Sequence, residues 1–236
     1  QTIWDGCKEA SDDHPYLIKK KIKANGIRVS GGDNRLVIPA YDEHGELSTV
    51  QFIDKDGKKL FHHGGGSKNR FFIIGSVTKT LYIAEGFATA ATIHEVTNQA
   101  VCVAFSKGNL LEVTRIMRDY YGPFHEIVIV ADNDESGGGQ KEAQIAGDRF
   151  GIKVIIPPVE GDANDYANAG YDLLELLHPK TESWLIPADL FCSQPAPTKW
   201  LIKHWLPESK LTMVFGPSGG GKSFLVIDWC CHIAAG

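Results

Sequence analysis

Paired cysteines are missing from this sequence. Its five cysteines show no CxxC pair and no spacing typical of metal ligands: Cys7, Cys102, Cys192, Cys230 and Cys231. This argues against a zinc site and favours reduced thiols over a disulfide framework. The sequence also lacks an apolar run long enough to span a bilayer, and its start has no secretory signal. We therefore expect a cytoplasmic chain with no membrane partner.

An initiator methionine is also missing, because the sequence begins with Gln1, and its end at Gly236 falls within a helical pattern. We expect a piece of a longer protein, so the absence of a motif excludes no function. The 236 residues, 43% of them hydrophobic, are enough to bury the cores of two domains and to begin another.

An overall basic charge is missing too, since the net charge is −5. The distribution is uneven: residues 1–80 hold thirteen Lys and Arg against ten Asp and Glu (+3), whereas residues 81–236 hold eleven against nineteen (−8). A basic first part beside an acidic second part fits phosphate contact next to a metal site, although +3 is also typical of an ordinary solvated surface.

Two apolar segments end on acidic residues. Residues 127–130 have the pattern of a buried strand and run into Asp132 and Asp134, whose spacing lets both carboxylates face the same way. Residues 80–84 form a second apolar segment, which ends on Glu85. Carboxylates at a strand end suit a hard divalent cation that also holds phosphates, although Asp-x-Asp alone is equally typical of a solvated turn.

The segments around these acids alternate between strand and helix patterns. Strands are expected at 80–84, 101–105, 126–131 and 153–157, and helices at 86–97, 109–121 and 138–150. Such alternation is typical of an α/β fold with a mostly parallel, Rossmann-like sheet. Ligands of these sheets bind beyond the carboxyl ends of the strands, where Glu85, Asp132 and Asp134 all fall. The sequence therefore predicts a ligand site at that edge.

The order of these elements resembles the Toprim domain: a strand, an acid followed by glycine, a small-residue helix, and a strand with Asp-x-Asp. Primases, type IA and type II topoisomerases and some nucleases share this domain. Within that group, three segments resemble the primases of phages, plasmids and integrated elements: residues 84–90, 105–110 and 131–134. Residues 161–165, Gly-Asp-Ala-Asn-Asp, are similar to the element that follows the Asp-x-Asp strand in phage primase-helicases. The resemblance covers most of the chain.

This resemblance implies a metal site built from carboxylates. Asp132 and Asp134 would hold one or two Mg²⁺ ions, or Mn²⁺, with Asp162 and then Asp165 as further ligands. Glu85 would either join the metal shell or act as general base on a 3′-hydroxyl. Its alternative is a structural carboxylate that interacts with the dipole of the following helix.

Residues 1–78 are predicted to form a small basic α+β domain. A helix is expected at 14–23, with either a solvated or a DNA-contacting basic face, and strands at 35–41, 47–53 and 58–61 are expected to form an antiparallel meander. A glycine-rich loop follows at 64–70 and ends in two cations.

By the same resemblance, basic residues of the first domain hold the template and the nucleoside triphosphate. The candidates are Lys58, Lys59, Lys68 and Arg70. Lys107, which follows the strand at 101–105, is a further candidate for phosphate contact, with an ordinary surface lysine as the alternative.

The most specific motif lies near the end of the sequence, where residues 216–223 read Gly-Pro-Ser-Gly-Gly-Gly-Lys-Ser. This matches GxxxxGK[ST], between an apolar strand expected at 211–215 and a helix expected from 224. Lys222 would reach the β- and γ-phosphates of ATP, and Ser223 would ligate Mg²⁺. The remaining ATP-binding candidates form the phosphate cradle: Gly216, Ser218, Gly219, Gly220 and Gly221.

Four regions follow from these patterns. They are an α+β domain at 1–78, a Toprim domain at 79–178, a linker at 179–210 and the start of a P-loop NTPase (RecA-like) domain at 211–236. This order resembles a primase-helicase. Because the sequence ends 13 residues after Ser223, we expect an incomplete ATPase or helicase portion and no useful hydrolysis of ATP.

The function that this resemblance implies is that of a DNA primase, which transfers nucleotides from nucleoside triphosphates onto a primer on single-stranded DNA, with replication proteins as further partners. Three alternatives stay open. A Toprim nuclease of the overcoming-lysogenization type uses the same acids, but its ATPase normally precedes the Toprim domain. A topoisomerase needs a tyrosine nucleophile, and none of the seven tyrosines has a recognisable setting. A non-catalytic module that binds single-stranded DNA or loads a helicase is the third.

Overall fold

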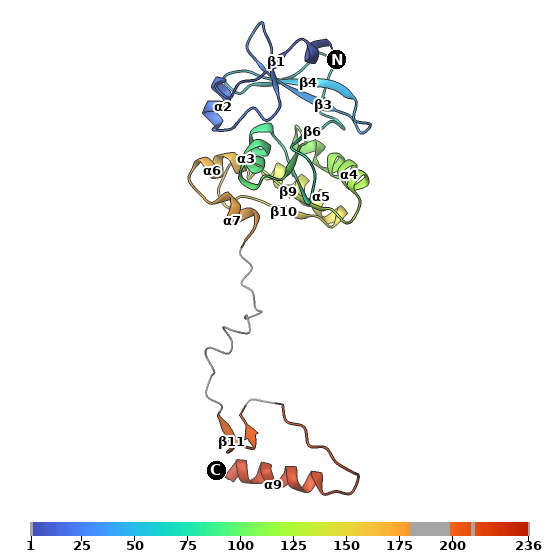
Figure 1. The fold of residues 1–236 in the computed structure, drawn as a ribbon, viewed down its shortest axis with the longest axis vertical. Coiled ribbons are helices and arrows are strands. Elements are labelled where there is room, and N and C mark those ends of the chain that lie inside the picture. Colours follow the sequence, from blue (N-terminus) through green and yellow to red (C-terminus); the bar gives the residue numbers. More distant parts are fainter. Residues whose placement is uncertain (1, 180–198, 209–210, 236) are drawn as a thin grey trace. The chain divides into compact units, whose positions relative to one another are not determined.

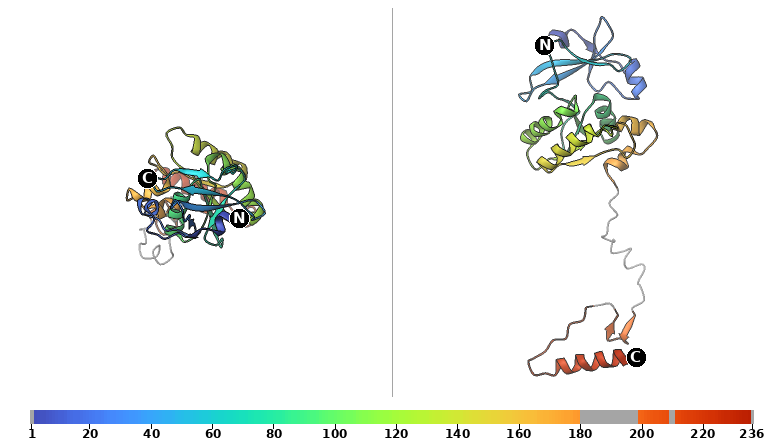
Figure 2. Two further views of the ribbon diagram at one scale, coloured as in Figure 1. Left: turned by 90° about the horizontal axis from the view of Figure 1, so that it is seen from above. Right: turned by 180° about the vertical axis from the view of Figure 1, so that it is seen from behind.

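The computed structural model describes residues 2–179, 199–208 and 211–235 (Figure 1). The chain divides into two compact units, Gln1–Lys180 and Thr181–Gly236. The first unit contains two sheets with their helices, and Figure 2 shows the same elements from two further sides. The residues expected to form the first two domains thus lie in a single compact unit.

The first sheet is antiparallel, with the strand order β1-β2-β3-β4-β5. Its strands are β1 (Lys8–Glu9), β2 (Arg28–Val29), β3 (Leu36–Tyr41), β4 (Leu47–Ile53) and β5 (Lys59–Phe61). The last three confirm the predicted meander. Asp42 and Asp54 close its turns by accepting hydrogen bonds from backbone N–H groups two and four residues further on. Strands β1 and β2 were not predicted, since two residues are too few to show an alternating pattern.

Two short helices belong to this sheet, α1 (Thr2–Asp5) and α2 (Pro15–Lys20). Helix α2 is shorter than the helix predicted at 14–23. It begins where the His14 side chain accepts a hydrogen bond from the Tyr16 N–H, with Pro15 in the first turn. It ends because Lys21 takes the left-handed conformation, with φ of 53°.

The second sheet has the order β10-β9-β7-β8-β6. Its strands are β6 (Phe72–Ile74), β7 (Thr80–Ala84), β8 (Ala100–Val103), β9 (Glu126–Val130) and β10 (Lys153–Ile155). The four predicted strands are confirmed and are mutually parallel, whereas the edge strand β6 is antiparallel and was not predicted. The helices are α3 (Phe87–Thr97), the 3₁₀ turn η1 (Lys107–Asn109), α4 (Leu110–Tyr121), α5 (Gly138–Phe150), α6 (Ala163–Asn168) and α7 (Leu173–Leu177).

Alternate residues of the central strands serve two separate cores. In β7, Tyr82 and Ala84 lie in a core that includes α3 and the inner face of the first sheet. Leu81 and Ile83 point the other way, into a core that includes α4 and α5. The first core is shared by both sheets, which explains why residues 1–78 and the parallel sheet form one unit.

Gly147 lets α5 lie close to β10. A Cβ at this position would be 2.5 Å from Val154 Cγ2 and 2.9 Å from the Ile152 carbonyl oxygen. Alanine in a helix normally stabilises by roughly 0.5–1 kcal/mol over glycine. Here we expect Gly147→Ala to lower the free energy of unfolding by about 1–3 kcal/mol, because a backbone oxygen cannot give way.

Urea denaturation measures this effect. The exposed Lys141, on the same helix, provides a control, and Lys141→Ala should change the free energy of unfolding by less than about 0.5 kcal/mol. A Gly147→Ala chain that is more stable than the parent would show that the helix can move away from β10.

The second unit contains a hairpin and a helix. They are β11 (Trp200–Ile202), β12 (Leu206–Pro207) and α9 (Lys222–Ala235). The hairpin lies within the segment predicted as a linker, of which 180–198 and 209–210 lie outside the described residues. The strand predicted at 211–215 is wrong: the segment is not a strand, and in the described part of the unit no neighbour pairs with it. None of the described helices combines the length and hydropathy needed to cross a membrane.

Candidate active site

The central strand β7 has a parallel neighbour on each side. Ala84, its last residue, is in register with Val103 of β8 and with Val130 of β9. Glu85 and Asp132, which follow these strands, therefore lie at adjacent strand ends. Lys107 follows β8 on the other side of β7, so the carboxyl edge of the sheet carries two acids and a lysine within three neighbouring strands.

Asp132 lies in a strongly unfavourable setting for a charge. Burial, followed by the charges of Glu85 and Asp162, raises the pKa of Asp132 to about 7. Burial also raises the pKa of Glu85, against the backbone N–H of Lys107 and nearby ammonium groups. A carboxylate whose pKa is raised by neighbouring acids lies in a site that a cation would stabilise.

Asp134 has a different environment from Asp132. Its Oδ2 accepts hydrogen bonds from Lys107 Nζ at 3.2 Å and from Ser136 Oγ at 3.1 Å. Burial alone would raise the pKa of Asp134, but these hydrogen bonds outweigh it and hold the pKa below its usual value. The Lys107–Asp134 ion pair is partly exposed, with 46% and 35% of the two side chains open to solvent, so an incoming ligand can reach it.

A second lysine reaches the acids from the first sheet. Lys59 of β5 places its Nζ 3.1 Å from where a Cβ of Gly86 would lie, directly beside the end of β7. Its charge lowers the pKa of both Glu85 and Asp132. Lys59 of the first sheet and Lys107 of the turn after β8 therefore flank the carboxylates. Glycine at position 86 leaves the space that the Lys59 side chain occupies.

The other basic candidates lie elsewhere. Lys58 belongs to the turn closed by Asp54, to which its backbone N–H donates at 2.9 Å. Lys68 and Arg70 lie in the glycine-rich loop, where Arg70 Nε donates to Ser48 Oγ at 2.6 Å. The structure thus brings Lys59 and Lys107 to the acids and leaves the other three predicted cations outside that cluster.

Asp162 and Asp165 both make local contacts. Asp162 Oδ1 caps α6 by accepting from the Asp165 N–H at 2.8 Å, and its Oδ2 accepts from Thr89 Oγ1 at 3.0 Å. Asp165 forms an ion pair with Lys20 Nζ at 2.9 Å. Asp162 is still close enough to raise the pKa of Asp132. The metal-binding roles predicted for both residues stay predictions.

Two of the carboxylates have oxygens that are free to bind a metal ion. Among the described residues, Asp132 Oδ1 and Asp134 Oδ1 are buried yet have no hydrogen-bond partner. In the same residues, no three His, Cys, Asp or Glu side chains already stand close enough together to hold an ion. The two unpartnered oxygens suit Mg²⁺, which is usually held by one or two carboxylates and completes its shell with water and substrate phosphates.

Two hydroxyl side chains of this region were not predicted. Ser136 donates to Asp134, and Thr89 donates to Asp162, so both orient a predicted acid. Ser136 lies two residues after the Asp-x-Asp motif, which is a signal that the sequence offers. Thr89 gives no such signal, because only the fold brings it to a residue 73 positions further along the chain.

The glycine-rich motif of the second unit has the backbone of a tight loop. Gly219 and Gly221 have φ of 77° and 73°, which side chains disfavour, and α9 begins at Lys222. Lys222 Nζ donates to the carbonyl oxygens of Gly216 at 2.9 Å and Pro217 at 2.6 Å. The loop and the helix after it are as predicted, and ATP binding stays a prediction.

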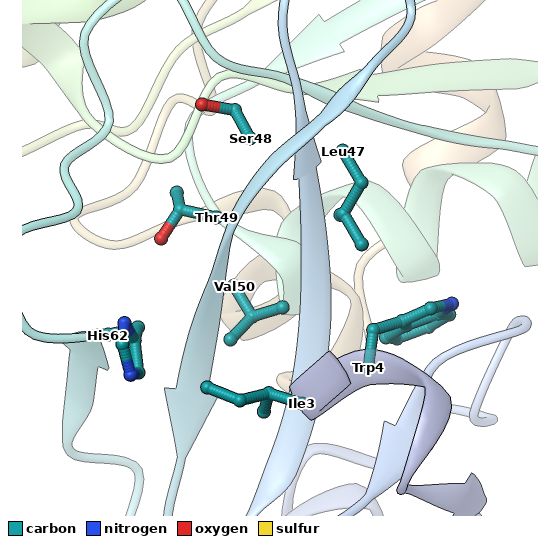
Figure 3. A pocket seen from close by; sticks show the side chains of 7 residues that line it. All are labelled: Ile3, Trp4, Leu47, Ser48, Thr49, Val50 and His62. Atoms are coloured by element: carbon teal, nitrogen blue, oxygen red, sulfur yellow. The ribbon is translucent and has the colours of Figure 1, made fainter. Parts of the chain in front are cut away.

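Figure 3 shows a separate pocket on the first sheet. It is lined by Ile3, Trp4, Leu47, Ser48, Thr49, Val50 and His62. None of the predicted site residues contributes to this lining, and it contains no carboxylate. The strand-end acids therefore remain the candidate site.

Two regions of the chain match known families. Residues 80–171 match the family model of the Toprim domain, and residues 177–236 match that of an AAA domain. The chain is also similar to two proteins of Escherichia coli that are both named DNA primase TraC, at 32% identity over 165 residues and at 30% over 165 residues. Each alignment covers 64% of this chain, but the chain spans only 16% and 11% of the length of those relatives.

Solved structures share the fold. The primase fragment of the bacteriophage T7 primase-helicase protein has a TM-score of 0.55 at 18% identity, over 73% of this chain and 79% of that one. The DnaG primase catalytic domain bound to ssDNA has a TM-score of 0.50 at 12% identity, over 72% and 74%. At these identities the likeness concerns the fold.

The parallel sheet with acids beyond its central strands is a Toprim domain, as predicted, and Toprim domains of primases generally use a divalent metal. After it, residues 177–236 match an AAA domain. A Toprim region followed by an AAA region is the order expected from the sequence.

Proposed function

We propose that this chain contains the catalytic unit of a DNA primase, which makes short primers on single-stranded DNA by nucleotidyl transfer from nucleoside triphosphates. One observation carries the proposal: half-buried carboxylates at adjacent strand ends are flanked by Lys59 of the first sheet and by Lys107 of the turn that follows β8. Such a site can hold a metal-bound triphosphate. The similarity to the TraC primases supports the same reading.

The residues at this edge divide the work. Asp132 and Asp134 would hold Mg²⁺, or Mn²⁺ in its place, with Asp162 nearby. A bound ion would supply electrostatic stabilisation of the attacking and leaving oxygens. Lys59 and Lys107 contact the triphosphate and draw it toward the carboxylates.

Glu85 has the most direct chemical role in this proposal. Burial raises its pKa, which makes its carboxylate a better proton acceptor than an exposed glutamate. It accepts the proton of the attacking 3′-hydroxyl or joins the metal shell. The helix-capping alternative has weak support, because α3 begins without a side-chain cap hydrogen bond and only its dipole could interact with Glu85.

The wider setting belongs to the same proposal. Single-stranded DNA and nucleoside triphosphates are the substrates, replication proteins are the partners, and the location is cytoplasmic. The loop at 216–223 would bind ATP, and Lys222 would then leave the loop carbonyls for the phosphates.

A primer synthesis assay tests the proposal. The chain is incubated with single-stranded DNA, labelled nucleoside triphosphates and Mg²⁺ or Mn²⁺, and products are separated by size. Short labelled oligonucleotides support a primase. Cleavage of the DNA without synthesis would instead support the nuclease, and binding of the strand with neither product would support the non-catalytic module; both results contradict the proposal.

Removing the Lys107 side chain should have opposite effects on metal binding and on primer synthesis. Its ammonium group occupies Asp134 Oδ2, so it competes with any cation for that oxygen. We expect Lys107→Ala to strengthen Mn²⁺ binding in the absence of nucleotide by roughly two- to fivefold. The same change should slow primer synthesis, because a phosphate contact is lost.

Calorimetric titration with Mn²⁺ measures the first effect, and the primer assay measures the second. Lys58→Ala serves as the control. Lys58 is the lysine next to Lys59 in the sequence but does not reach the acids, so this change should leave Mn²⁺ binding unchanged. Weaker Mn²⁺ binding by Lys107→Ala would show that the lysine organises the site rather than competing for it.

A further inference from the structure

Asn109 is a buried amide that joins the two sheets of the first unit. Only 4% of its surface is exposed, although asparagine is normally found at the surface. Its Nδ2 lies 2.7 Å from the Ser67 carbonyl oxygen, 2.9 Å from that of Arg70 and 2.8 Å from that of Ala104. Its Oδ1 accepts from the Asn69 N–H at 2.8 Å. One side chain therefore contacts four backbone groups, with its two N–H donors shared among three carbonyl oxygens.

These four groups come from distant parts of the sequence. Ser67, Asn69 and Arg70 belong to the glycine-rich loop, some 40 residues before Asn109, whereas Ala104 follows β8 of the Toprim sheet. Because the Asn69 N–H must donate to an oxygen, Oδ1 of Asn109 faces Asn69. The NH₂ group of Asn109 therefore faces the carbonyl oxygens. Asn109 thus bonds residues 67–70, which we call the basic loop, to the edge of the sheet that carries the acids.

The chain runs from the basic loop into β6 of the Toprim sheet, and Asn109 adds side-chain contacts from the loop to the residues that follow β8. Arg70 Nε donates to Ser48 Oγ, and a Cβ at Gly65 would overlap Thr49 Oγ1; Ser48 and Thr49 both lie on β4, as Figure 3 shows. These contacts attach the loop to β4 of the first sheet. Toward the Toprim side, Ser67 Oγ and Ser106 Oγ lie 3.0 Å apart and add one further hydrogen bond.

A groove runs along this junction. It is lined by Lys68 and Asn69 of the basic loop, by Ser106 and Gly108 beside Asn109, and by Glu112, whose carboxylate is paired with Arg115 at 2.7 Å. In the described ranges Lys68 makes no ion pair, so its charge is available to a ligand. Lys107 lies between Ser106 and Gly108 and extends to the acids. The phosphate backbone of a nucleic acid strand bound in the groove would therefore lead toward the candidate active site.

We propose that Asn109 is a positioning residue for primer synthesis: it fixes the basic loop so that Lys68 and Arg70 hold the phosphate backbone of single-stranded DNA beside the Toprim acids. The inference rests on the proposed function. Asn109 itself touches neither substrate nor metal, and it acts through the two cations.

Limited trypsin digestion tests the fixing of the loop without any turnover. Trypsin cleaves after lysine and arginine, and the Arg70 carbonyl that Asn109 holds belongs to one of the bonds cut. Asn109→Ala and the isosteric Asn109→Asp both remove the donors. We expect each to speed cleavage after Lys68 and Arg70 by roughly tenfold, while cleavage after Lys55, in the turn between β4 and β5, stays unchanged.

Asn164 provides a matched control. It is also buried, at 1% exposure, and its Nδ2 also binds a backbone carbonyl, that of Lys20, at 2.7 Å. Asn164→Ala should lower the melting temperature about as much as Asn109→Ala and leave cleavage of the basic loop as in the parent. Equal loop cleavage in both variants would overturn the proposal, because the effect would then be general loss of stability.

Fluorescence anisotropy with a labelled single-stranded oligonucleotide tests the link to the cations. We expect Asn109→Ala to weaken binding roughly fivefold, and to weaken it no further in a chain that already carries Lys68→Ala and Arg70→Ala. Additive losses would overturn the proposal. Primer synthesis by the parent is scored separately: a parent that binds the strand but makes no primer contradicts the proposed function, while the coupling result still decides the role of Asn109.

Discussion

The double variant Asp132→Asn, Asp134→Asn is expected to make no detectable primer. Both carboxylates have a buried oxygen without a hydrogen-bond partner among the described residues, and their removal takes away the charge that would hold a metal-bound triphosphate. Metal ions contribute several kcal/mol to stabilising such transition states, so the rate should fall by at least about a thousandfold.

The loss should not come from unfolding. Asparagine has the shape of aspartate, and Asp132 is the carboxylate that burial and its acidic neighbours disfavour most. Asp134→Asn loses the partly exposed ion pair with Lys107, a small loss that the Asp132 change offsets, so the melting temperature without metal should stay close to that of the parent. Primer synthesis and thermal unfolding measured on the same preparations separate the two causes.

Two surface acids supply a control with the same change of charge. Asp119 and Asp148 are exposed residues of α4 and α5. Asp119→Asn, Asp148→Asn should keep primer synthesis within roughly twofold of the parent. Synthesis that survives in the Asp132, Asp134 variant, or that is lost equally in the control, would refute the assignment of these acids.

The sequence predicted the edge of the sheet well because the signals there are local. An apolar segment followed by an acid marks both the strand and its end, and Glu85 and Asp132 need no partner elsewhere in the chain to be noticed. Alternation of strands and helices then places both acids at one edge, as the register of β7 and β9 has it.

The environment of these acids could not be predicted in the same way. Lys59 reaches them only because β5 pairs with β4 and the first sheet packs on the second, and nothing in the sequence distinguishes Lys59 from Lys58. Asp162 was predicted as a ligand. Its role as the N-cap of α6, where it accepts a hydrogen bond from the Asp165 N–H, was not predicted. Long-range packing decides which charged residue meets which.

The strand at 211–215 failed for a related reason. Its apolar residues fit a buried strand, but a strand is stable only when neighbours pair with it, and the described part of the second unit provides none. Periodicity thus identifies segments that can form strands. Whether they do is decided by partners outside the segment.

Glu85→Gln is expected to abolish primer synthesis while the fold stays intact. Glutamine keeps the size and hydrogen-bonding capacity of the side chain and removes only its charge and its ability to accept a proton. General base catalysis contributes typically 10²–10⁴-fold, so the rate should fall by at least about a hundredfold. Because burial disfavours the charged carboxylate, the melting temperature should not fall.

A second glutamate at a strand end gives the matched control. Glu126 begins β9 at the opposite edge of the same sheet and accepts a hydrogen bond from Thr80 Oγ1 at 2.8 Å, which glutamine can also accept. Glu126→Gln should therefore keep the parent's rate of primer synthesis.

Mn²⁺ titration of Glu85→Gln then separates the two catalytic roles of Glu85. If it is the base, the variant binds Mn²⁺ as the parent does and fails only in synthesis, because the proton of the 3′-hydroxyl has no acceptor. If it is a ligand, binding and synthesis fall together. Full activity would reject both roles and leave Glu85 as a partner of the α3 dipole, in which case its burial beside Asp132 would serve the fold rather than the chemistry.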